Sequence, residues 1–175
     1  MGLPLRNVCD HGFLARDNAM LPWTSTAEIS RFAISKRLRQ RAINGSAEVI
    51  EFPIDYDARR RIPDISLGLM QAVIEMASAA GVTHLCAAME PALLRMLRRL
   101  GMHFFSLGSE IEYHGRRQPC YVDLDAGLVK TWFDRPEVWD FLTRSGELWP
   151  LNRDLAMAVR QARMIGPRLQ LAAEA

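Results

Sequence analysis

The order of hydrophobic and polar positions predicts a chain in which strands and helices alternate. Residues 28–35 switch between polar and apolar side chains, as a half-buried strand does. Apolar positions at helical spacing predict helices over residues 67–80, 92–100, 135–144 and 153–165. Short apolar runs predict strands over residues 49–54, 82–88 and 102–107, and a hairpin that joins 110–114 to 118–124. This pattern indicates an α/β (α+β) fold, with a mixed sheet flanked by helices.

Several residues predict where these elements begin and end. Asp64 or Ser66 is expected to cap the helix that starts near residue 67. Pro91 suits the first turn of the next helix, because its missing N–H is not needed there. Gly101 is expected to end that helix. The segment Gly115-Arg116-Arg117 is expected to form the turn of the hairpin.

The composition is that of an ordinary globular protein. The chain has 175 residues, of which 49% are hydrophobic, and a net charge of only +2, which argues against bulk nucleic-acid binding. No apolar run reaches the roughly 18 residues that a membrane-spanning helix needs. Cys9, Cys86 and Cys120 are widely spaced and form neither a disulfide framework nor a zinc pattern. We therefore expect a reducing cytoplasm and no metal.

Polar groups gather on the strand predicted over residues 28–35. Glu28, Ser30 and Arg31 crowd one short segment, and burying a carboxylate costs several kcal/mol unless it is paired. The strand is therefore expected to border a cleft. A basic run follows over residues 36–41, and the small residues of 44–46 free backbone amides, which suits a phosphate or pyrophosphate. An edge strand with a solvated basic loop would give the same pattern, so both interpretations stay open.

Two runs of the sequence resemble a known group of enzymes. EISRFAISKRLRQR, residues 28–41, resembles the central strand and loop of acyl-homoserine-lactone (autoinducer) synthases and of long-chain N-acyl amino acid synthases. It also resembles the acyltransferases associated with PEP-CTERM/exosortase systems. EIEYHGRRQPCYVDL, residues 110–124, is the most specific part of the likeness to this last group. All belong to the GNAT acyltransferase superfamily, so the resemblance implies a GNAT-like fold.

The resemblance also implies roles for residues of the strand and loop. Glu28 would be the catalytic base, Ser30 a hydrogen-bond donor, and Arg31 the group that holds an acceptor carboxylate. The residues expected to bind the acyl donor are Phe32, Ala33, Ile34, Arg39, Gln40, Arg41 and Ala42. Ala42 stands where the GNAT loop has its first glycine, and Leu97 stands where many GNAT enzymes have a proton-donating tyrosine. Both departures favour the synthase branch over an ordinary acetyltransferase.

The implied activity is N-acyl transfer. A fatty acyl group would pass from an acyl carrier protein or acyl-CoA thioester to an amine, either an amino acid or a homoserine-lactone-like acceptor. The thioester is expected as a cosubstrate, with no cofactor bound permanently. Two alternatives stay open: a generic acetyl-CoA-dependent acetyltransferase, and a non-catalytic binding remnant of the fold. The sequence also leaves a homodimer open.

The resemblance further implies a division of the chain. Residues 1–125 are expected to form a GNAT-like acyltransferase core that lacks the first strands of the family's sheet. Residues 126–175 are expected to form a helical extension packed on this core. Without those first strands, the central strand would expose an edge. A fragment, a start assigned too late and a degenerate relative all stay open as explanations.

Overall fold

A five-stranded mixed sheet forms the centre of the part of the chain that the structure describes. This computed structural model describes residues 21–30 and 61–162. The strand order is β1-β2-β5-β3, and β4 also pairs with β5. β1 runs parallel to β2, whereas β5 is antiparallel to β2, β3 and β4. The bounds are β1 Thr26–Glu28, β2 His84–Met89, β3 Phe105–Ser106, β4 Ile111–Glu112 and β5 Arg116–Asp123.

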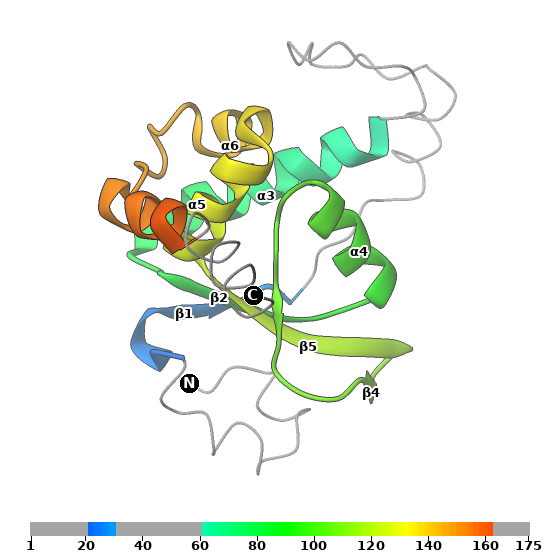
Figure 1. Ribbon diagram of the computed structural model, residues 1–175. Coiled ribbons are helices and arrows are strands. Elements are labelled where there is room, and N and C mark those ends of the chain that lie inside the picture. Colours follow the sequence, from blue (N-terminus) through cyan, green and yellow to red (C-terminus); the bar gives the residue numbers. More distant parts are fainter. Residues whose placement is uncertain (1–20, 31–60, 163–175) are drawn as a thin grey trace, which may run out of the picture.

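Helices cover one face of this sheet (Figure 1). They are α3 (Arg61–Ala80), α4 (Pro91–Arg99), α5 (Leu124–Asp134) and α6 (Pro136–Thr143), and residues 153–162 are also helical. α3 contacts α6, and the Gln71 side chain of α3 donates a 2.5 Å hydrogen bond to the Phe141 carbonyl of α6. None of the described helices is long and apolar enough to span a bilayer.

The alternation of side chains along β2 separates two hydrophobic clusters. Leu85, Ala87 and Met89 are buried against the helices in the larger cluster. Cys86 and Ala88 point to the other face, where a smaller cluster also contains Leu21, Leu107 and Tyr121. Successive residues of a strand face opposite sides of the sheet, so the β2 sequence itself assigns each residue to a cluster.

The predicted α/β fold class is confirmed, and so are most helix positions. α4 begins at Pro91 and is followed by Gly101, whose φ of +83° suits glycine. The predicted start of α3 near residue 67 was wrong, because this helix begins at Arg61. Asp64 and Ser66 therefore lie inside it, and neither residue is its N-cap. The expected division near residue 125 stays a prediction, and β5 passes directly into α5 at Leu124.

Two strands and the hairpin turn have bounds that differ from those predicted. The strand expected over residues 28–35 begins at Thr26, and β1 ends at Glu28. The strand expected over 102–107 is only two residues long, Phe105–Ser106. The turn of the hairpin lies at residues 113–115, because Arg116 and Arg117 already pair with Glu112 and Ile111. The edge strand predicted over 49–54 lies outside the described residues.

Candidate functional site

Glu28 is the last residue of β1 and stands on the sheet face that lies opposite the helices. In the strand register, Glu28 is level with Cys86 of β2. Cys86 is level with Tyr121 of β5, and Tyr121 is level with Phe105 of β3. Residues that are level on neighbouring strands share a face. We call these four residues the transverse row. Strands lie about 4.8 Å apart, so the backbones of Glu28 and Tyr121 are about 10 Å apart.

The pairing of β1 with β2 ends beside Glu28. The Ile29 amide donates a 2.8 Å hydrogen bond to the Cys86 carbonyl. β2 continues for three more residues, Ala87 to Met89, for which the described register gives no partner on β1. Backbone groups on one edge of a strand recur every second residue. The Ala88 amide therefore faces the same edge as the Cys86 carbonyl, at the point where the two strands part.

Of the residues predicted for the site, the structure describes Glu28 and Ser30. Glu28 is half-buried and Ser30 is exposed two residues further along the chain. Residue Arg31, expected to hold the acceptor, lies outside the described residues. So do the expected donor-binding residues Phe32, Ala33, Ile34, Arg39, Gln40, Arg41 and Ala42. The structure thus places the expected base, and the roles of the residues outside the described ranges stay predictions.

Tyr121 is a candidate functional residue that sequence analysis missed. Its ring is half-buried and packs against Phe105, with the ring centroids 5.8 Å apart. A phenol in the transverse row is a candidate proton donor on the same face as Glu28. Leu97, in contrast, is fully buried in the core and has no group that could donate a proton. The alternation of buried Cys120 and Val122 around Tyr121 was the signal that could have assigned its face.

The two described cysteines do not supply a nucleophile. Cys86 is 0% exposed although it belongs to the transverse row, and Cys120 is 1% exposed on the helix-covered face. Burial, with a smaller effect of Cys86, raises the pKa of the Cys120 thiol to about 12. A thiol reacts as its thiolate, so Cys120 is unreactive at neutral pH. Both cysteines act as small packing residues.

A polar network joins β2 to β5 at His84 and Asp123, which lie two residues along their strands from Cys86 and Tyr121 of the transverse row. The Thr83 hydroxyl lies 2.9 Å from Nδ1 of His84, and Nε2 of His84 lies 3.4 Å from Oδ2 of Asp123. Oδ1 of Asp123 accepts a 2.9 Å hydrogen bond from the Ala126 amide and thereby caps α5. The network therefore ties the start of β2 to the end of β5.

The chemistry open to this site is acid–base chemistry at a strand edge. Within residues 21–30 and 61–162, no group of three or more His, Cys, Asp or Glu side chains could hold a metal ion. Glu28 and the edge that carries the Ala88 amide lie at the end of β1, and the Tyr121 phenol belongs to the same sheet face two strands away. These are groups that remove a proton, stabilise an oxyanion and return a proton.

Comparison with known proteins gave limited matches. No protein-family model matches the chain, and no curated protein matches it. Solved structures of TofI, in an apo form and in a ternary complex with an inhibitor and MTA, are each 26% identical to this chain, with a TM-score of 0.34. The match covers 42% of this chain and 42% or 40% of the TofI chains, so it spans less than half of TofI.

Proposed function

We propose that this protein is an N-acyltransferase that moves a fatty acyl group from a thioester to an amine. The observation that carries the proposal is the position of Glu28, at the place where β1 stops pairing and the edge of β2 continues. The resemblance of residues 28–41 to acyl-homoserine-lactone and N-acyl amino acid synthases gives the reaction class.

Glu28 is the proposed base of this reaction. The nitrogen of the amine attacks the thioester carbonyl carbon, a C–N bond forms, and the C–S bond breaks. The Glu28 carboxylate accepts the proton that the nitrogen loses, directly or through a water molecule. The departing thiolate takes a proton from the Tyr121 hydroxyl or from water, which leaves a free thiol on the carrier.

The backbone edge beyond Glu28 is the proposed site of the thioester carbonyl. The Ala88 amide faces this edge, and an N–H aimed at the developing oxyanion lowers the barrier of acyl transfer. Ser30 is a second candidate donor. An extended thioester arm laid along the edge of β2 would also take the place of the strand partner that the described register lacks there.

The donor is proposed to be an acyl-CoA or acyl carrier protein thioester, both of which present a phosphate. The basic loop with Arg39, Gln40, Arg41 and Ala42 would bind that phosphate, and Phe32, Ala33 and Ile34 would line the acyl chain. Arg31 would hold an acceptor carboxylate. The fully buried Leu97 counts against a generic acetyltransferase that uses a tyrosine at this position. We infer that a fatty acyl group is transferred in preference to an acetyl group.

Mass spectrometry of lipid extracts tests this function. Cells that produce the full chain are expected to contain a new N-acyl amine, and Glu28→Gln is expected to lower its amount about 100-fold or more, as the loss of a general base does. Glu147→Gln, which changes an exposed glutamate far along the chain, is the matched control and should leave the amount unchanged. Soluble protein without a new product, or a fully active Glu28→Gln variant, would contradict the proposal.

A further inference from the structure

A groove lies between α4 and the strands β3 and β5, on the sheet face opposite Glu28. Its volume is about 250 Å³, close to the lower end of small-molecule sites at about 300 Å³. One wall comes from α4, with Leu94, Arg95 and Arg98, and the other includes Phe104 and Gln118. α4 stands over the part of the sheet that β5 forms (Figure 1). Cys120 on the floor belongs to the helix-covered face, so the groove is separate from the transverse row.

Two positive charges border this groove without a described counter-ion. Arg95 and Arg98 are one helical turn apart on α4, so their side chains stand on the same side of the helix. Both are exposed, and neither guanidinium makes an ion pair or hydrogen bond with another residue in the described ranges. The charge of Arg98 also contributes to lowering the pKa of His103, so its field reaches the neighbouring residues.

The polar groups of the opposite wall are already occupied. The Gln118 side-chain amide donates to the Ser106 hydroxyl at 2.8 Å and to the Gly108 carbonyl at 2.6 Å. The Ser106 hydroxyl donates to the same carbonyl at 2.7 Å. The Glu110 carboxylate is paired with Arg116, whose Nε lies 2.8 Å away. The two α4 guanidiniums therefore supply the free hydrogen-bond donors of the groove.

We propose that the groove binds a small organic anion. Its phosphate or carboxylate group lies across Arg95 and Arg98, because guanidinium groups bind such oxyanions through charge-assisted, often bidentate hydrogen bonds. Its apolar part lies against Leu94 and Phe104, which line the same groove. The neutral Cys120 thiol adds no negative charge to the floor. This site does not depend on the acyl-transfer proposal, since it is on the other face of the sheet.

Calorimetric titration of the full chain with phenyl phosphate tests the site. Saturable binding is expected, and Arg95→Gln and Arg98→Gln should each weaken it about tenfold or more, because each removes a charged donor. Arg160→Gln, an exposed arginine on the helix over residues 153–162, is the matched control and should bind as the unmodified chain does. Unchanged thermal midpoints would show that the variants fold.

Three further ligands separate the parts of the proposal. Benzoate should bind at the same place if a carboxylate suffices, and inorganic phosphate should bind more weakly than phenyl phosphate because it lacks the apolar part. Phenol should not compete, because it lacks the charge. The proposal is overturned if phenyl phosphate fails to bind, or if it binds both arginine variants as tightly as it binds the control. Either result would show that Arg95 and Arg98 are simply solvated charges.

Discussion

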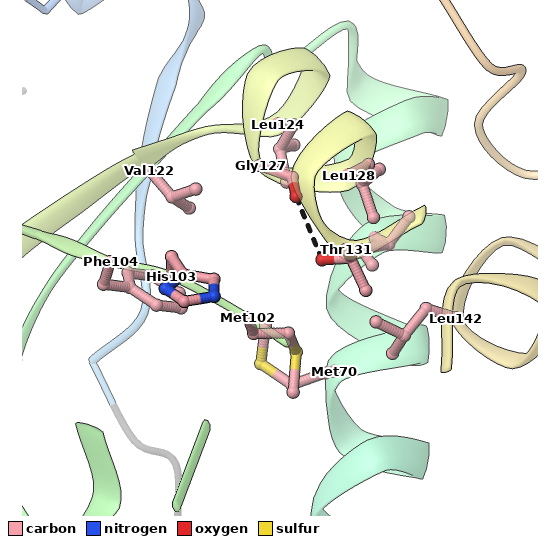
Figure 2. Close-up of a pocket in the computed structure, with 11 residues that line it drawn as sticks. Met70, Met102, His103, Phe104, Val122, Leu124, Gly127, Leu128, Thr131 and Leu142 are labelled. Atoms are coloured by element: carbon pink, nitrogen blue, oxygen red, sulfur yellow. Dashed lines mark hydrogen bonds between the residues drawn. The ribbon is translucent and has the colours of Figure 1, made fainter. Parts of the chain in front are cut away.

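His103 carries a ring nitrogen that the fold removes from water without giving it a hydrogen bond. Nε2 is buried and lies 3.4 Å from Oδ2 of Asp134, which Lys130 approaches to 2.7 Å. The ring borders a cavity of about 30 Å³, enough for about one water molecule (Figure 2). Burial lowers the pKa of His103, Lys130 and Arg98 lower it further, and Asp134 partly opposes them. The neutral imidazole is therefore favoured in the folded protein.

This lowered pKa predicts a loss of stability in mild acid. The unfolded chain binds a proton on His103 near its ordinary pKa of 6.5, whereas the folded chain binds it only at a lower pH. The free energy of unfolding should thus fall as the pH drops below 6.5, and this contribution should be absent above that pH. Urea titrations from pH 8 to pH 5 would measure it, by comparison with His103→Gln.

A second variant separates the causes of this effect. Lys130→Met removes a positive charge that lowers the pKa of His103. The fall in the free energy of unfolding that His103 causes between pH 8 and pH 5 should therefore be smaller in this variant. The account of His103 is contradicted if the unmodified chain and His103→Gln lose the same free energy of unfolding between pH 8 and pH 5. The imidazole would then titrate alike in the folded and the unfolded chain.

At the scale of elements, α4 is set by its two ends. Pro91 occupies the first turn, and Leu100 follows the helix before Gly101 turns the chain with a φ of +83°. A Cβ at residue 101 would lie 3.0 Å from Cγ of Arg135 and 3.4 Å from Thr131. The Thr131 hydroxyl donates a 2.9 Å hydrogen bond to the Gly101 carbonyl, which holds this turn against α5. Both the backbone angle and the close packing require glycine here.

Two glycine substitutions should therefore act in opposite directions. Gly101→Ala is expected to destabilise the protein by about 1 to 3 kcal/mol, because alanine is strained at this φ. Gly68→Ala is the matched control, since that residue lies inside α3 with no atom within 4 Å of an added Cβ. It should stabilise the protein by about 0.5 to 1 kcal/mol. Denaturant unfolding would measure both, and equal effects of the two changes would contradict this account of the turn.

The elements also show what local sequence signals determine. Periodicity placed α4 within one residue at each end, because its proline and glycine mark those ends. It placed the start of α3 too late, since proline is tolerated in a first helical turn and Pro63 does not mark a boundary. The hairpin turn was misplaced because His114 takes a positive φ of 50° and Gly115 one of 95°, which moves the turn ahead of Arg116. Such a conformation is uncommon for histidine.

At the scale of the whole molecule, the sheet separates two kinds of surface. The helices bury one face, and the transverse row with Glu28 occupies the other. The sequence alone could suggest Glu28 and Ser30, because both lie in one recognisable run. It could not assign Tyr121, because the sheet face that this residue shares with Glu28 follows from strand pairing between residues far apart in the chain. Long-range register of this kind leaves no local pattern in a sequence.

The account depends most on the edge of β2 where β1 and β2 part, and amide hydrogen exchange there tests it directly. The full chain would be titrated with palmitoyl-pantetheine thioether, an unreactive mimic of the part that both proposed donors share. If the thioester arm lies along this edge, exchange of the Ala88 amide should slow on binding, while the Leu142 amide in α6 should serve as an unchanged reference. A chain that binds the mimic with no change at Ala88, or does not bind it, would contradict the account.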